Sequence, residues 1–258
     1  MDAATAQETT RPCLPSAPSS PRGSAGERAG QIGGALCNDA CVDYVEALVK
    51  LGSWTAEQWG LVTAAQAGQE GIDGVRLGQL TRAGLLTDVG DGVYQHAGAP
   101  PTEHLEIKTA WLRLDPAVPA WHRLAQDEYS GVVSHSSACR MHQLGDLPSE
   151  TVEILVPGWR TGSHQGVRLH HERTVDPSDI TVVDGLPVTT VTRTITDLLK
   201  VGLDGGHIGG VIADAERNRL ISIDALAGHI TPFARAYGLS ASATGHDLIG
   251  HLTDQAAR

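Results

Sequence analysis

Apolar residues first recur at helical spacing from Val42 onward. The residues that share one side of this expected helix are Val42, Val45, Leu48 and Val49. Their spacing of three and four positions gives the helix one apolar face, which we expect to pack on a core. Gly52 is expected to end it, because glycine is unfavourable in a helix interior.

Two short helices are expected next, each introduced by a residue that can cap its first turn. Thr63 followed by Gln66 has the form of a capping box, in which each side chain bonds the backbone N–H of the other residue. Asp73 is a second candidate N-cap. These signals predict helices over 64–69 and 73–83, the pair of a helix-turn-helix.

A β-hairpin is predicted directly after the second of these helices. The run L-L-T-D-V-G-D-G-V-Y-Q-H, residues 85–96, has β-prone residues on both sides of Gly90, Asp91 and Gly92. Glycines there permit the positive φ angles of a tight hairpin turn. A hairpin that follows a helix-turn-helix is a wing, so the pattern predicts a winged helix-turn-helix.

Composition and prolines divide the chain into three expected parts. Residues 1–36 are rich in Ser, Pro, Gly and Ala but poor in large apolar residues, which predicts a disordered tail. Pro100 and Pro101 mark a second boundary. Residues 37–98 would then form the winged helix-turn-helix domain. Residues 99–258 would form a mixed α/β domain with a helical C-terminal end, which makes the predicted fold class α+β.

The middle of the second domain is expected to contain three strands and one turn. The strands expected there are 151–156, 167–171 and 180–183. Gly185, Leu186 and Pro187 are expected to form a turn. A helix capped by Thr190 or Thr192 should follow.

Composition then limits the function. The chain has 258 residues and a formal net charge of −11, which argues against a globally basic nucleic-acid binder. It contains no run near the roughly 20 apolar residues of a membrane span, and residues 1–36 lack a secretory apolar core. We therefore expect a cytoplasmic protein. Cys37 and Cys41 stand four apart with no second Cys or His pair at zinc-finger spacing, so neither a metal site nor a cofactor is expected.

The polar side of the 73–83 helix is the candidate DNA reader, since it lies opposite Leu77 and Leu80. The candidate DNA-binding residues on this helix and the wing are Val75, Arg76, Gln79, Arg82 and Tyr94. The alternative is a solvated helix face, because the helix carries only two positive charges.

A second set of basic residues surrounds the strand predicted from Val167. Its members are Arg160, Arg168, His170, His171 and Arg173. If their side chains converge, they offer a surface for RNA or for a second DNA contact. The alternative is a polar edge strand that charges protect from aggregation.

The sequence offers no convincing catalytic centre. It lacks a G-x-S-x-G elbow, a Walker loop and a G-x-G-x-x-G after a strand. Glu106 and Lys108 could belong to a metal-dependent nuclease, but no Asp stands on a nearby strand outside the wing. Ser134, His135 and Ser136 could suggest a nucleophile and base, although a strand end and helix cap explain them better. No catalytic residue is predicted.

Four stretches taken together resemble the AbiEi family of type IV antitoxins from abortive-infection systems, in its version with an N-terminal winged helix. They are Q-W-G-L-V-T-A-A-Q-A from Gln58 to Ala67, R-A-G-L-L with G-D-G-V-Y from Arg82 to Tyr94, V-V-S-H-S-S-A from Val132 to Ala138, and D-I-T-V-V-D-G-L-P-V-T-T-V-T-R-T-I-T-D-L-L from Asp179 to Leu199. The order and spacing of these stretches are more specific than any one of them.

The resemblance implies two roles. The winged domain would bind inverted repeats in operator DNA upstream of its own operon, and the second domain would counter a nucleotidyltransferase toxin without a stable complex. The chain departs from the family pattern, since relatives usually carry several arginines in the recognition helix and wing, whereas this wing holds Asp88 and Asp91. A stand-alone winged-helix regulator, with a ligand-sensing or dimerising second domain, is the alternative function.

Overall fold

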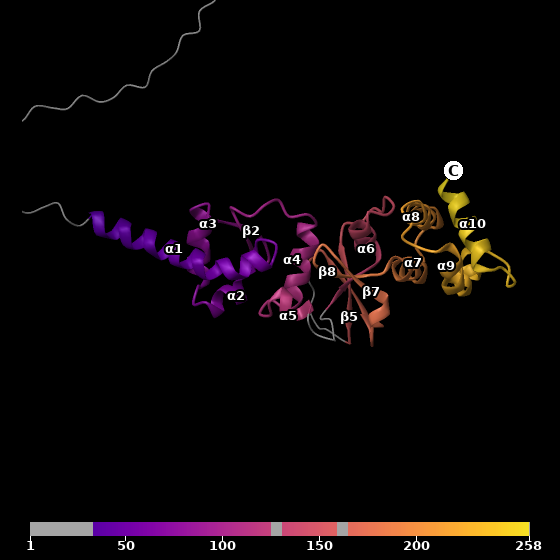
Figure 1. Ribbon diagram of the computed structural model, residues 1–258, viewed down its shortest axis with the longest axis horizontal. Coiled ribbons are helices and arrows are strands. Elements are labelled where there is room, and N and C mark those ends of the chain that lie inside the picture. Colours follow the sequence, from indigo (N-terminus) through magenta and orange to yellow (C-terminus); the bar gives the residue numbers. More distant parts are fainter. Residues whose placement is uncertain (1–32, 125–130, 159–164, 258) are drawn as a thin grey trace, which may run out of the picture. The chain divides into compact units, whose positions relative to one another are not determined.

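The computed structural model describes residues 33–124, 131–158 and 165–257 (Figure 1). The first 32 residues of the expected tail lie outside the described residues, and helix α1, Gly33–Glu57, begins just after them. Residues 42–258 form one unit.

Helix α1 differs from the expectation in its end and in its buried face. It runs past Gly52 to Glu57. Val45 and Val49 are 61% and 72% exposed, whereas Leu51 and Trp54 are buried. The expected apolar face was therefore wrong. The larger side chains that follow Val49 set the buried side of the helix, and the valines lie away from it.

The winged helix-turn-helix is confirmed. Helix α2, Ala64–Gln69, begins at the predicted capping box of Thr63. Helix α3, Gly74–Arg82, begins at Asp73, whose side chain accepts a hydrogen bond from the backbone N–H of Arg76.

Three strands complete this segment. They are β1 Leu61–Thr63, β2 Leu86–Gly90 and β3 Val93–His96, in the antiparallel order β1-β3-β2. Asp91 and Gly92 join β2 to β3 with φ angles of 51° and 77°, as a tight hairpin turn requires. Strand β1 was not predicted, because a three-residue buried run carries no periodicity.

The second segment centres on a five-stranded mixed sheet in the order β6-β5-β4-β8-β7. Its strands are β4 Val132–Val133, β5 Val152–Pro157, β6 Val167–Glu172, β7 Ile180–Val183 and β8 Leu186–Thr189. Its accompanying helices are α4 Leu105–Leu114, α5 Ala120–Leu124, α6 His135–His142 and the 3₁₀ turn η1 Pro177–Asp179. The expected turn at 185–187 was wrong in part, because the hairpin turns at Asp184 and Gly185 and β8 already begins at Leu186.

Helices make up the C-terminal end. They are α7 Val191–Lys200, α8 Gly205–Arg217, α9 Ile223–Ile230, the 3₁₀ segment η2 Thr231–Tyr237, and α10 Gly245–Ala256 (Figure 1). Thr190 caps α7, as one of the two predicted alternatives. Helices α8 and α10 approach so closely that a Cβ atom on Gly209 would lie 2.0 Å from the carbonyl oxygen of Leu252. The chain is a mixed α+β protein with a helical C-terminal end.

Buried contacts cross from the winged segment to the sheet segment. Leu61 and Val93 belong to the same apolar cluster as Ile107, Trp111 and Leu186. Burial of such residues is the main favourable term in folding. One apolar core therefore contains residues from both sides of the boundary predicted after residue 98.

Two buried glutamines reinforce this contact. Gln58 and Gln66 are fully buried and exchange amide hydrogen bonds of 2.9 and 3.1 Å. Gln58 Oε1 also accepts from the backbone N–H of Ala120 at 3.0 Å, and Gln66 Nε2 donates to the carbonyl of Val118 at 3.3 Å. Buried amides require such partners, so these bonds fix the winged segment against the segment between α4 and α5.

Replacing Gln58 with alanine should destabilise the whole chain. The Gln58→Ala change leaves the Ala120 N–H without its partner and removes both hydrogen bonds between the two buried amides, which should lower the free energy of unfolding by about 3 kcal/mol. Gln69→Ala is the matched control, because Gln69 is exposed and donates one hydrogen bond to the carbonyl of Ala117. Urea unfolding measures both. Equal, small losses in the two variants would show that the buried amides do not join the segments.

Candidate nucleic-acid interface

Helix α3 presents part of the predicted face to solvent. Leu77 and Leu80 are buried at 1% and 0% exposure, whereas Val75 is 69% exposed. Arg82 is also exposed and Gln79 is half-buried. The inner and outer sides of the helix therefore lie as the sequence pattern predicted.

Arg76 is held by other residues of the winged segment. Its guanidinium forms an ion pair with Asp43 and lies over the ring of Tyr44, 5.3 Å from the ring centroid. It also donates a hydrogen bond of 3.0 Å to Gln79 Oε1. In this structure Arg76 joins α3 to α1. Sequence reasoning missed this role, because Asp43 lies over thirty positions away.

Arg82 is the more available cation of α3. In the part of the chain that the structure describes, its guanidinium has no ion pair within 4 Å. A free guanidinium at the end of an exposed helix face can donate two hydrogen bonds to one acceptor group.

Both acidic residues of the wing interact with other groups of the chain. Asp91 Oδ2 lies 2.6 Å from Nη1 of Arg113, on α4. Asp88 accepts a hydrogen bond of 2.9 Å from the backbone N–H of Gly90. The Arg113 contact places a positive charge beside one wing carboxylate and so reduces its repulsion of phosphates. Tyr94 is half-buried on β3, where it packs against the apolar cluster that includes Leu77 and Leu80.

The second basic strip is divided between two sides of the sheet. Arg168 and His170 stand two positions apart on β6 and share one face, while His171 lies on the other. Arg173 is exposed just after β6, and Arg160 lies outside the described residues. The described members of the strip therefore do not converge on one surface.

A buried polar cluster lies on the Arg168 side of β6. The ring of His135 stacks on that of His170, with centroids 3.6 Å apart. His170 Nε2 lies 3.2 Å from Glu153 Oε1, and Ser136 donates backbone and hydroxyl hydrogen bonds to Glu153 Oε2. Ser134 occupies the N-cap position of α6 but makes no capping bond, and its hydroxyl lies 3.0 Å from His135 Nδ1.

Burial and neighbouring charges shift the acid–base behaviour of this cluster. Burial, aided by His170, lowers the pKa of His135 to about 4, so its imidazole is neutral at pH 7. Burial alone would raise the pKa of Glu153, but hydrogen bonds from His170 and Ser136 outweigh it and hold the pKa at about 2. The cluster is built around the charged carboxylate of Glu153, which also lies 3.7 Å from Nη1 of Arg168.

Glu106 and Lys108 do not share a site. Glu106 pairs with Arg140, whereas Lys108 is 2% exposed and lies 2.5 Å from Asp184 Oδ2. Positions two apart on a helix point to different sides. Among the described residues, no group of three His, Cys, Asp or Glu side chains is placed to hold a metal ion.

Comparisons with known proteins add little to this geometry. No family model and no curated protein matches the sequence. One solved structure that matches is the RV2827C protein from Mycobacterium tuberculosis, at 13% sequence identity and a TM-score of 0.47. The match covers 82% of this chain and 78% of that one. A likeness this weak carries no functional argument.

None of the helices in the described ranges is both long and apolar enough to cross a membrane.

The neutral His135 predicts that stability falls in mild acid. The pKa of His135 is about 4 in the folded chain and 6.5 in the unfolded chain. Between these two pH values His135 is protonated in the unfolded chain and neutral in the folded chain. Stability is therefore lost as the pH falls through this window, by about 3 kcal/mol from this residue. His135→Asn should remove that share of the pH dependence.

Urea unfolding at pH 6.5 and pH 4 measures the effect. Asparagine suits this position because His135 has a φ angle of 51°, which asparagine tolerates. His229→Asn serves as the control, since His229 is exposed. An unchanged pH dependence in His135→Asn would contradict the assigned pKa.

Proposed function

We propose that the chain is a DNA-binding autorepressor that also acts as the antitoxin of a type IV toxin-antitoxin system. The observation that carries the DNA-binding half is the capped helix α3, whose outer face leaves Val75 and Arg82 exposed directly before a hairpin wing. In winged helix-turn-helix proteins such a second helix enters the major groove.

The winged segment has few basic residues, which favours specific contacts with DNA bases over general attraction to phosphates. Its basic residues from 42 to 98 are Lys50, Arg76 and Arg82. Lys50 pairs with Glu46 and Arg76 with Asp43, which leaves Arg82. Few counterions would be released on binding, so the affinity should depend only weakly on salt.

The antitoxin half rests on the resemblance of the four sequence stretches to AbiEi antitoxins. Two of them, around Val132 and from Asp179, fall in β4, α6 and β7 to α7 of the sheet segment. We propose this segment as the part that counters a nucleotidyltransferase toxin, without a stable complex between the two proteins.

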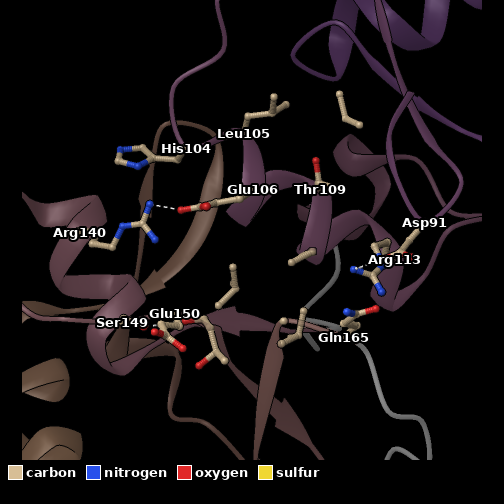
Figure 2. Close-up of a pocket in the computed structure, with 16 residues that line it drawn as sticks. Asp91, His104, Leu105, Glu106, Thr109, Arg113, Arg140, Ser149, Glu150 and Gln165 are labelled. Carbon is tan, nitrogen blue, oxygen red and sulfur yellow. Dashed lines mark hydrogen bonds and ion pairs between the residues drawn. The ribbon is translucent and has the colours of Figure 1, made fainter. Parts of the chain in front are cut away.

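One observation favours the alternative of a stand-alone regulator with a ligand-sensing segment. A cleft of about 590 Å³ lies between the wing hairpin, α4 and the β5–β6 edge (Figure 2). Its size falls in the range of small-molecule sites.

Loss of the Gln79 amide and the Arg82 guanidinium from α3 should weaken operator binding. Arginine and glutamine each contribute about 1–3 kcal/mol when they contact a base, so the double change Gln79→Ala and Arg82→Ala should reduce affinity about 30-fold or more. Fluorescence anisotropy on the gene's own upstream DNA measures this. Arg235→Ala is the control, because Arg235 is exposed on η2. Unchanged affinity in the double variant would mean that α3 is not the reader.

Arg76→Ala separates the contact role from the structural one. Since Arg76 joins α1 to α3, its loss should lower the melting temperature more than Arg82→Ala does.

Co-expression with a nucleotidyltransferase encoded beside the gene tests the antitoxin half. The full chain should restore growth to cells that express the toxin. Continued growth arrest, with the antitoxin present and folded, would favour the stand-alone regulator.

A further inference from the structure

The cleft beside the wing is bounded along one side by a single face of α4. Glu106, Thr109, Ala110 and Arg113 all line it, at positions i, i+3, i+4 and i+7 of the helix. Seven residues of helix advance about 10 Å, so the two charged residues lie about two turns apart. Val152 and Val167 also line the cleft and contribute apolar surface to it.

Charged groups stand at both ends of this cleft. Figure 2 shows Arg140 with Glu106 at one end and Arg113 with Asp91 at the other. Glu150 lies at the Arg140 end. Two guanidinium groups thus face three carboxylates, with the extra negative charge at the Arg140 end.

A buried hydroxyl without a partner lies between these ends. Thr109 is 8% exposed, and no hydrogen bond to its Oγ1 exists among the described residues. Figure 2 shows the hydroxyl pointing toward the Leu105 end of α4. Its Oγ1 is closed off from solvent, so this hydroxyl belongs to the packed side of α4 and not to the open surface of the cleft.

We propose that this cleft binds a short zwitterionic peptide, with its ammonium group at Glu106 and Glu150 and its carboxylate at Arg113. The charges favour a ligand that carries both signs, because a dianion would meet three carboxylates and a dication would meet two guanidinium groups. An extended chain advances about 3.3 Å per residue, so about three residues span the distance between the two ends.

The existing ion pairs do not prevent such binding. The side chains of Glu106 and Arg140 are 57% and 37% exposed, and that of Asp91 is 52% exposed. The Glu106–Arg140 pair is exposed enough to contribute little to stability, so its members can exchange partners readily. Arg113 is only 15% exposed, so the ligand carboxylate has to replace Asp91 at a largely buried guanidinium.

The site has a regulatory consequence that rests on the proposed DNA-binding function. Arg113 holds the wing residue Asp91, so a ligand carboxylate at Arg113 competes with the wing for the same guanidinium. Binding would free the carboxylate of Asp91 and loosen the hairpin. Operator affinity should then fall when the peptide is bound.

Calorimetric titration of the full chain with trialanine tests the site. Trialanine should bind, and at ten times its Kd it should raise Tm by about 3–6 °C. N-acetyl-trialanine amide, which lacks both charges, should not bind. Succinate should bind more weakly than trialanine. Binding of the blocked peptide equal to that of trialanine, tighter binding of succinate, or no binding of trialanine at 10 mM would each overturn the proposal.

Variants locate the site. Glu106→Gln and Arg113→Gln should each weaken trialanine binding at least tenfold. Arg217→Gln should leave it unchanged, because Arg217 pairs with Asp214 on α8. Asp91→Asn removes the carboxylate that pairs with Arg113, so this variant should bind trialanine more tightly. It tests the role of Arg113 even if Arg113→Gln fails to fold. Unchanged binding in Glu106→Gln and Asp91→Asn would place the peptide elsewhere.

Operator titrations with and without trialanine separate the two proposals. A chain that binds trialanine but no operator DNA would overturn the proposed function and leave the site intact. A chain that binds operator DNA but no trialanine would overturn the site alone.

Discussion

Helix α4 is buried along most of its length, and both halves of the described fold pack on it. Seven of its ten residues are buried, among them Trp111 and Lys108. Leu61 and Val93 reach its cluster from the winged segment, and Leu186 reaches it from the five-stranded sheet. A helix that is buried on nearly all sides requires neighbours on nearly all sides. The winged segment is one of those neighbours, so its position depends on this contact.

The same helix supplies the polar groups that connect the wing to the remaining fold. Arg113 holds the hairpin tip through Asp91, and Lys108 holds the turn before β8 through Asp184. Because these residues leave α4 in different directions, one rigid element fixes the wing and one sheet hairpin together. Replacing Arg113 would therefore remove a contact with the wing and leave the apolar contacts of α4 in place.

Local signals predicted the parts of the fold that depend on nearby residues. The caps at Thr63, Asp73 and Thr190 and the turn at Asp91 are properties of four or five consecutive residues, and the structure has all of them. Hydrophobic spacing failed on α1, where it could not tell which apolar residues meet a partner.

Partners distant in the sequence were beyond these signals. Strands β1 and β8 are too short or too uniformly buried to show a period. The contacts of Arg76 with Asp43 and of Arg113 with Asp91 join separate elements. Neither residue type nor spacing could therefore predict them. The candidate reader could be placed on α3 from the sequence, but which of its side chains are free could not.

Hydrogen–deuterium exchange on the full chain, with and without its own upstream DNA, tests the central claim most directly. That claim is that α3 and the β2–β3 hairpin form the DNA surface while α4 holds them in place. DNA should slow the exchange of backbone amides in 74–82 and 86–96, and it should leave 167–172 on β6 unchanged. Protection confined to 167–172, with none in α3, would contradict it.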